Sequence, residues 1–475
     1  MKLNDIDIHS TLEALKNGLS QEKDIPPSLK ALIELLMLIV QLMMNHLGLN
    51  SQNSSKPPSS DLNRVKKKRK PSDNKVGGQR NHSGTTLMRV EEPDEVTVIP
   101  IDRRTLPKGH RYQDVGFETR QVFDIDISRV VTEYRAQVLE DESGKRFVAS
   151  FPEGVTKAVQ YGNNVKAHAV YLSQYQLLPY QRVQEYFSEQ LDIPLSQGTL
   201  FNFNKEAFER LAPFSQLVKK ALIASSRVHA DETGINIDGK GHWLHCASND
   251  LWTDFFPHEK RGNEAIDSRG ILPQFNGVLC HDHWKPYYRY ENCLHALCNA
   301  HHLRELTRAH EQDKQTWAGE MKIFLETLNK AVHEAEGSLQ KNEATRYLRR
   351  YRKILREAEK ECPPPDDDRK KGQRGRLKRS KARNLLERLI DYESDILRFM
   401  TEPDVPFSNN LGERDIRMTK VQQKISGCFR SKEGAEIFCR VRSYLSTCRK
   451  HGLCSSEALA MIFEGKLPDF AKAAL

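Results

Sequence analysis

RVHADET, at residues 227–233, is a short apolar run that ends in two adjacent acids, Asp231 and Glu232. Its alternation predicts a β-strand, and the Asp238-Gly239 pair that follows predicts a hairpin turn. GVLCHD, at residues 277–282, is a second apolar run, and it ends in Asp282. The two runs therefore predict two strands that each carry an acid at their end.

Further strands and helices are predicted around these two runs. Strands are expected at 243–247, 252–256 and 295–300, and helices at 261–274 and 301–309. The resulting order, β-β-β-α-β-α-β, resembles the ribonuclease H-like fold, a mixed sheet flanked by helices. In that fold the first and fourth strands are neighbours, so we expect Asp231 and Asp282 to converge.

Glu413 is the candidate for a third acid. It lies in FSNNLGERDIR, residues 407–417, where Ser408 or Asn409 can cap a helix and place Glu413 in its first turns. Neighbouring carboxylates repel each other, and a pair of Mg²⁺ (or Mn²⁺) ions about 3.5–4 Å apart relieves that repulsion while stabilising phosphoryl displacement. We therefore expect Asp231, Asp282 and Glu413 to hold two such ions.

Basic residues follow Glu413 on the same predicted helix face. Arg417, Lys420 and Lys424 come at successive spacings of four, three and four residues, which keeps them on one side of a helix. Cations beside a metal-binding carboxylate are expected to contact DNA phosphate.

The net charge of +9 is concentrated in two segments. Residues 64–80 carry +7 and residues 369–383 carry +9, which leaves −7 for the rest of the chain. Two basic segments on a mildly acidic body favour binding to the phosphate backbone of nucleic acid. A solvated linker is the alternative for both. In the first segment, which follows NSSKPPSSD, the expected DNA contacts are Lys66, Lys67, Lys68, Arg69 and Lys70.

The apolar run at residues 31–49 predicts a dimerisation helix. Ile33, Leu36, Val40, Met43 and Leu47 step by three and four residues, as the seam of a coiled coil does. A helix packed on the protein's own core is the alternative. A polar stripe disfavours a membrane span, and the start of the chain does not resemble a secretory signal. Nine cysteines without a C-x-x-C pair favour reduced thiols and a cytoplasmic, nucleoid-associated protein.

Between the basic arm and RVHADET, the pattern changes from strands to helices. Alternation at residues 122–127, 130–138 and 147–151, with a Ser143-Gly144 turn, predicts a small β module. Helices are expected at 180–191 and 197–211, with Ser196 as a cap. This pair could be a DNA-reading helix-turn-helix or an ordinary helical hairpin.

Several motifs together resemble bacterial transposases of the insertion sequence 66 family across nearly the whole chain. They are NSSKPPSSD, the Gly77-Gly78-Gln79 turn followed by His82-Ser83-Gly84, FPEGV, VQYG, PLSQGTL, HADET, CNAHHLREL and NNLGERDIR. The resemblance implies cutting and joining of DNA at terminal inverted repeats by a DDE site, whose acids map onto Asp231, Asp282 and Glu413. It also implies an insertion domain before the last acid, and 131 residues separate Asp282 from Glu413.

The chain departs from the family pattern at its cysteines. Many members have a cysteine-rich zinc module before the catalytic domain, but no cysteine precedes Cys246 here, so no zinc is expected. Cys298 and His301 match the family's C-x-x-H element. We interpret them as a buried cysteine and a hydrogen-bonded histidine, and His281 and His283 as packing residues that could alternatively orient Asp282 or approach the phosphate.

Seven regions follow from these patterns. They are a dimerisation helix (1–50), a basic DNA-contacting arm (51–100), a zinc-less β module (101–155), a helical region (156–220), the first part of the ribonuclease H-like core (225–310), an α-helical insertion (311–405) and a C-terminal catalytic helix and tail (406–475). The predicted function is that of a DNA transposase acting as a homodimer or higher oligomer, with accessory proteins as possible partners. A nuclease that cuts without joining and an inactive, domesticated DNA-binding protein are the alternatives.

Overall fold

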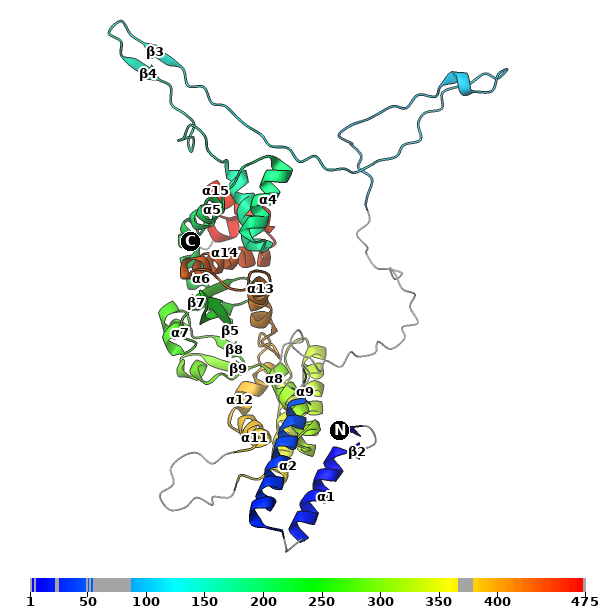
Figure 1. The fold of residues 1–475 in the computed structure, drawn as a ribbon, viewed down its shortest axis with the longest axis vertical. Helices are drawn as coiled ribbons and strands as arrows, with labels where there is room; N and C mark the ends of the chain where they lie inside the picture. The colour runs from blue at the N-terminus through cyan, green and yellow to red at the C-terminus, as the bar shows by residue number, and fades with distance from the viewer. Residues whose placement is uncertain are drawn as a thin grey trace.

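The structure, a computed structural model, describes residues 2–3, 6–21, 25–47, 50, 53, 87–365 and 379–472. The predicted DNA contacts at Lys66–Lys70 lie outside the described residues, as does most of the second basic segment. Figure 1 shows a sheet in the middle of the molecule, with one group of helices at each end of its long axis.

The central sheet has five strands in the order β7-β6-β5-β8-β9. Its antiparallel half consists of β5, β6 and β7, and β8 and β9 continue it in parallel to β5. The expectation that the first and fourth strands are neighbours is confirmed, because β5 pairs directly with β8. The bounds are β5 (Arg227–Ile237), β6 (Lys240–Ser248), β7 (Thr253–His258), β8 (Val278–His281) and β9 (Leu294–Leu297).

Strand β5 is much longer than its parallel neighbour. Its pairing with β8 covers only Arg227 to His229, whereas its pairing with β6 continues to Ile237. Beyond His229, this edge of β5 pairs, among the described residues, only through an isolated parallel bridge between Ile237 and Phe429. Helix α13 (Asn410–Ser426) packs against β5 and β6 and covers this part of the sheet.

Helices that precede the sheet in the sequence and helices near the end of the chain share one hydrophobic core beside the sheet. Leu200, Phe214, Leu222 and Tyr444 are almost fully buried in it. The predicted helix at 180–191 is confirmed, and the Ser196 hydroxyl accepts a hydrogen bond from the Thr199 amide at 3.0 Å, as a cap does. The helices are α3 (Asn163–Val170), a π-helical turn (Tyr171–Tyr175), α4 (Tyr180–Leu191), α5 (Gln197–Arg210), α6 (Ala212–Ile223), α14 (Lys432–Lys450), α15 (Ser455–Phe463) and α16 (Asp469–Lys472).

The segment between the second and third acids is helical, as predicted. Its helices pack into a second hydrophobic core around Trp317, Phe324, Tyr351 and Leu386, which they share with strands β8 and β9. Helix α8 (Asn299–Glu311) links this core to the sheet. The insertion helices are α9 (Thr316–Glu334), α10 (Lys341–Glu361), α11 (Lys381–Asp391) and α12 (Glu393–Leu397), and the 3-10 turn Arg398–Met400 follows α12. Between β7 and β9 lie α7 (Asn263–Arg269) and the 3-10 turns Leu272–Gln274 and Lys285–Arg289.

The predicted β module is largely wrong. Within residues 101–155 the strands are β3 (Val138–Glu140) and β4 (Arg146–Val148), which form one hairpin, and a 3-10 turn spans Arg103–Thr105. The Ser143-Gly144 turn is confirmed, with Gly144 at a positive φ of 79°. Every residue of this hairpin is exposed. A lone hairpin buries no apolar face, so alternation alone does not extend the strands.

Two helices precede the arm. They are α1 (Ile8–Gln21) and α2 (Pro27–Leu47), after the two-residue strands β1 (Lys2–Leu3) and β2 (Ile6–Asp7). Leu36 and Met43 of the predicted coiled-coil seam are about 60% exposed. Within the described part of the chain, no helix is both long and apolar enough to cross a bilayer.

Candidate active site

The three predicted acids lie where β5, β8 and α13 meet. Asp231 is on β5 just beyond its pairing with β8, and Asp282 directly follows β8. His229 pairs with Cys280 at an offset of 51 residues, and the same offset separates Asp231 from Asp282. Glu413 is in the first turn of α13. The strand register therefore puts the first two acids level with each other, and α13 brings the third.

Asp231 is held in an environment that disfavours its charge. Burial raises the pKa of its carboxyl well above the usual value, and the negative charges of Glu232, Asp282 and Glu413 add to that effect. One amide, that of Glu232, donates a hydrogen bond to Oδ1 at 2.9 Å. Among the described residues, no Lys, Arg or His forms an ion pair with Asp231 or Asp282.

These groups fit a bound divalent cation. Neighbouring carboxylates without a protein cation have the donor chemistry that Mg²⁺ or Mn²⁺ prefers, since hard cations take oxygen ligands. A cation would also offset the repulsion that raises the pKa of Asp231. Asp231, Asp282 and Glu413 all offer such oxygens, although in this structure the three carboxylates are not gathered within 4.8 Å of one another.

Asn409 fastens α13 to β5. Its side chain is almost fully buried, its Nδ2 donates to the Ala230 carbonyl at 2.8 Å, and its Oδ1 lies 2.7 Å from His229 Nδ1. Because Oδ1 can only accept, His229 is the donor in this pair. Burial lowers the pKa of His229 to about 4, so the ring is neutral. The residue predicted as a possible cap instead uses its side chain to position the helix.

Close packing at Gly412 brings α13 against the first acid. A Cβ at Gly412 would lie 3.5 Å from the Cβ of Asp231 and 3.3 Å from Asn409 Oδ1. An alanine at Gly412 would therefore contact Asp231 at an ordinary distance and would require the Asn409 side chain to shift slightly.

The basic face of α13 has two parts. Lys420 Nζ donates to the Gly234 carbonyl at 2.7 Å, and Gln423 Nε2 donates to the same oxygen at 3.2 Å. These bonds give the Gly234 carbonyl, on the edge of β5 that faces away from β6, its hydrogen-bond partners. Arg417 and Lys424 are exposed, and neither has a hydrogen-bond or ion-pair partner in the described part of the chain.

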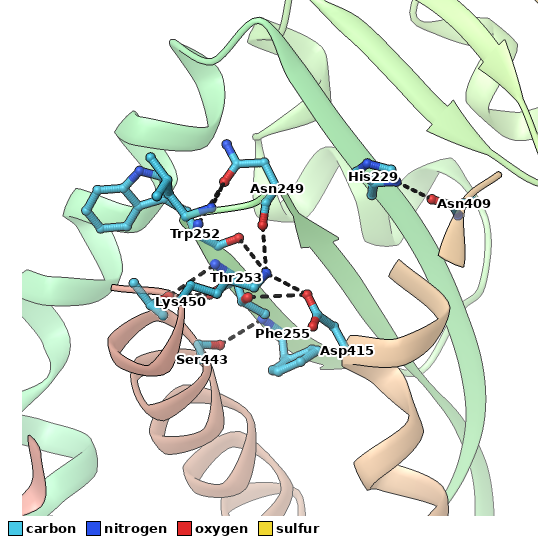
Figure 2. Close-up of polar contacts among 11 residues, drawn as sticks. His229, Asn249, Trp252, Thr253, Phe255, Asn409, Asp415, Ser443 and Lys450 are labelled. Carbon is cyan, nitrogen blue, oxygen red and sulfur yellow. Dashed lines mark hydrogen bonds and ion pairs between the residues drawn. The ribbon is translucent and has the colours of Figure 1, made fainter. Parts of the chain in front are cut away.

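A buried ion pair ties α13 to α14, the helix that runs beside the edge strand β7 (Figure 2). Lys450 of α14 lies 2.7 Å from Asp415 of α13, and both side chains are about 10% exposed. The same ammonium donates to the Asn249 carbonyl at 2.7 Å. Ser443 and Thr447 of α14 accept hydrogen bonds from backbone amides of β7, at 2.8 and 3.1 Å. Helix α14 therefore covers the edge strand and anchors α13.

Glu232, the acid beside Asp231, has a different environment. Its buried carboxylate accepts hydrogen bonds from Arg261, at 2.6 and 2.9 Å, and from the Tyr287 hydroxyl at 2.5 Å. Burial raises the pKa of Glu232, while Tyr287 and Arg261 oppose that rise. The guanidinium carbon of Arg261 also lies 4.7 Å from the centre of the Trp243 ring and 4.4 Å from the centre of the Trp284 ring. Glu232 is thus already neutralised by protein groups.

The histidines around Asp282 pack away from it. His281 is fully buried, donates from Nε2 to His295 Nδ1 at 3.0 Å, and accepts the His283 amide at Nδ1. Burial lowers the pKa of His281 well below its usual value. His283 packs edge-on against Tyr392, with ring centroids 4.5 Å apart.

Cys298 and His301 lie next to Glu413. The Cys298 thiol is 3.9 Å and His301 Nδ1 is 3.7 Å from Glu413 Oε1. Cys298 is buried, as expected, but the expectation of a hydrogen-bonded histidine is not met at Nδ1, which is buried without a hydrogen-bond partner. Arg304 Nη2 lies 3.9 Å from the other carboxylate oxygen of Glu413.

Sequence reasoning missed three positioning features. The Asn409 bonds, the close approach at Gly412 and the Asp415–Lys450 pair all join segments that are far apart in the chain. The only sequence signal was the presence of Asn409, Gly412 and Asp415 within the NNLGERDIR motif. No spacing rule connects Lys450 to that motif.

Comparison with known proteins decides the family. The model of the Transposase IS66 family matches residues 158–437, more than half of the chain and all three acids. The chain belongs to the IS66 transposase family. A Family of unknown function (DUF6444) matches residues 3–88.

A curated relative adds only a partial likeness. The uncharacterized protein y4jO of Sinorhizobium fredii (strain NBRC 101917 / NGR234) is 33% identical over 69 residues, 14% of this chain. The match spans 22% of that protein, about a fifth of its length. The family model, and not this relative, therefore supports a transposase role.

Removing one member of the buried ion pair should destabilise the protein. We expect Lys450→Met to lower the free energy of unfolding by about 3–5 kcal/mol, because Asp415 would keep a buried, unpaired charge. Urea denaturation followed by circular dichroism measures this. The double variant Lys450→Met with Asp415→Leu should recover much of the lost stability. Lys472→Met, which breaks the exposed ion pair with Asp469, is the control and should change the stability little. A loss below about 1 kcal/mol, the range of surface pairs, would contradict the buried-pair interpretation.

Asp231→Asn should stabilise the metal-free protein. The raised pKa of Asp231 means that ionisation opposes folding at every pH above its folded-state pKa, and the penalty disappears as pH falls toward its unfolded-state value. Each pKa unit corresponds to about 1.4 kcal/mol. Melting temperatures in EDTA at neutral pH should therefore rise in Asp231→Asn, and added Mg²⁺ should stabilise the wild type more than the variant. Equal Mg²⁺ stabilisation in both proteins would remove Asp231 from the metal site.

Proposed function

We propose that this protein is an active transposase that cuts DNA at terminal inverted repeats and joins the freed ends to target DNA. The observation that carries the proposal is the convergence of Asp231, Asp282 and Glu413 in a chain of the IS66 transposase family. The mixed sheet with parallel β5 and β8 is compatible with a ribonuclease H-like core. The acids are then the DDE set of the site.

The chemistry of the site follows from its carboxylates. When bound at these acids, two Mg²⁺ (or Mn²⁺) ions would activate the attacking hydroxyl and stabilise charge on the phosphate. The Asn409 hydrogen bond and the close contact at Gly412 keep the first turn of α13, which carries Glu413, next to β5. No Ser or Tyr nucleophile is invoked, because the attacking groups are water and then the freed 3′-hydroxyl. The protein supplies position and electrostatics.

The exposed cations beside the site suit the DNA backbone. Arg414, Arg417 and Lys424 are exposed on α13, on the helix that carries Glu413. Lys420, also predicted to contact DNA, is bonded to the β5 edge, so its proposed role is to orient this face. The sequence-based arm at Lys66–Lys70 would bind phosphates in the same way.

Helix α10 in the insertion offers a second basic surface. Six Arg or Lys and no acid occur between Arg346 and Arg356. The apolar side of the helix, with Tyr351 and Ile354, is buried in the insertion core. Arg349, Lys353 and Arg356 are exposed on the opposite side, and they have no ion-pair partner among the described residues. We propose that this side contacts DNA phosphates.

The ends of the described structure suit assembly and DNA reading. The exposed apolar residues of α2 would form a coiled coil between two copies, which gives a homodimer or a higher oligomer. Helices α4 and α5, joined by residues 192–196, would form the helix-turn-helix. Association with the nucleoid and with accessory proteins of the same element belongs to this proposal.

The decisive experiment uses Asp282→Asn with a labelled element-end duplex, target plasmid and Mg²⁺. We expect the wild type to cut and join, and the variant to lose both activities while binding the duplex with unchanged affinity. Asp238→Asn is the matched control, since it makes the same exchange at the hairpin turn that ends β5. Its activity should equal the wild type, because Asn also tolerates the left-handed turn conformation.

Each alternative predicts a different result in this experiment. Cleavage without joining would favour a ribonuclease H-like nuclease. Binding without any cleavage by the wild type would favour an inactive, domesticated protein. Strand transfer that persists in Asp282→Asn would remove Asp282 from the site.

The α10 surface predicts a change in salt dependence. We expect Arg349→Gln, Lys353→Gln and Arg356→Gln together to weaken DNA binding and to reduce the slope of log affinity against log salt by up to about 3, roughly 0.9 for each phosphate that the protein no longer neutralises. Fluorescence anisotropy at several salt concentrations measures both. Lys432→Gln, Lys466→Gln and Lys472→Gln remove the same charge from exposed sites elsewhere in the chain. An unchanged slope in the α10 variant would show that its face is only solvated.

A further inference from the structure

The thiol, imidazole and carboxylate beside the third acid form a compact cluster. Cys298 is the residue before α8, His301 is in its first turn, and Glu413 comes from the first turn of α13. One potential ligand atom from each lies within 4.8 Å of the other two. Among the described residues, this is the group of Cys, His and acidic side chains gathered tightly enough to hold a single metal ion.

The free atoms of this cluster point to a missing partner. His301 Nδ1 is buried without a hydrogen-bond partner, and its nearest charged atom is Glu413 Oε1 at 3.7 Å. Arg304 faces one oxygen of Glu413, and the other, Oε1, accepts a long hydrogen bond from the Cys298 thiol, which a bound ion would replace. The side chains of His301 and Glu413 are 23% and 27% exposed, which gives an ion access from solvent. Cys298 is fixed at the inner end by the Asn409 amide, 3.1 Å from its sulfur.

The ligand chemistry selects a different class of ion from Mg²⁺. Thiolate and imidazole suit zinc and cobalt, whereas Mg²⁺ prefers oxygen ligands and near-ideal octahedral geometry. Three protein ligands of mixed N, S and O type, with a fourth position open, are also typical of catalytic zinc sites. Sulfur and nitrogen 3.9 and 3.7 Å from one carboxylate oxygen are close to the separations that ligands of about 2.0–2.3 Å bond length span around a tetrahedral ion.

We propose that Cys298, His301 and Glu413 form a binding site for a zinc-class divalent cation. Binding needs no oxidant or reductant: the thiol loses its proton to solvent, and the sulfur, the imidazole nitrogen and the carboxylate each donate an electron pair to the ion. The site differs from the cysteine-rich module whose absence led us to expect no zinc.

The site shares Glu413 with the proposed Mg²⁺ site. If the proposed function holds, an ion at Cys298 and His301 withdraws Glu413 from Asp231 and Asp282. Zinc-class ions would then suppress the Mg²⁺-dependent reaction. The C-x-x-H element thereby makes the third acid available for chemistry only when this neighbouring site is empty.

Cobalt is the probe that tests the site, because its thiolate complexes absorb in the near ultraviolet and its coordination number is visible in the d–d bands. Metal-free full-length protein is titrated with CoCl₂ and then with ZnCl₂. We expect one equivalent of Co²⁺ to give a thiolate charge-transfer band with tetrahedral d–d bands, and Zn²⁺ to remove both. Cys298→Ser should lose the charge-transfer band, and His301→Ala and Glu413→Gln should lose the tetrahedral spectrum.

Matched controls separate this site from other thiols and from the catalytic acids. Cys454→Ser removes an exposed cysteine that also has a nearby carboxylate, Glu457 at 3.7 Å, and should leave the spectrum unchanged. Asp282→Asn should leave it unchanged as well. A missing band in the folded wild type, or a band that persists in Cys298→Ser, would overturn the proposal. The spectrum is read without DNA, so a protein that binds Co²⁺ here but fails to cut DNA would contradict only the proposed function.

Discussion

The parallel register between β5 and β8 is the constraint on which the candidate site depends. Hydrogen bonds pair Arg227 to His229 with Val278 to Cys280, and this register fixes the height of every residue that follows on either strand. A shift by one residue would turn the side chains of β8 to the opposite face. Asp231 and Asp282 lie level with each other only in the observed register. Asp231 is therefore placed within the sheet, and Asp282 at the point where β8 ends.

The same register leaves the middle of β5 without a strand beside it among the described residues, and α13 packs there against β5 and β6. The helix is held by polar contacts as well as by apolar packing. Asn409 reaches two groups on β5, Lys420 and Gln423 donate to the Gly234 carbonyl, and Asp415 pairs with Lys450 of α14. Buried polar groups of this kind have stringent geometry, because an unsatisfied partner is costly. The third acid is therefore placed as firmly as the first two, although it comes from a distant part of the chain.

The site combines stabilising contacts around its edge with unfavourable electrostatics at its centre. Glu232 is neutralised by Arg261 and Tyr287, whereas Asp231 has no cation and carries a raised pKa. Charged groups kept apart from protein partners are typical of places that bind an external ligand. The insertion helices pack into a hydrophobic core that they share with β8 and β9, and the basic side of α10 faces away from that core.

The sequence by itself determined the strand and helix order of the core and the helical insertion, and it proposed the three acids, because these depend on local periodicity and on short motifs. It also overestimated structure at residues 120–151, where alternation is present but no second layer buries it. Only the tertiary structure decided that Asn409 binds β5 instead of capping its own helix, that Lys420 bonds to a strand edge, and that Cys298 and His301 flank Glu413. Those outcomes depend on which distant segments meet, and burial and hydrogen-bond satisfaction, rather than spacing along the chain, select those meetings.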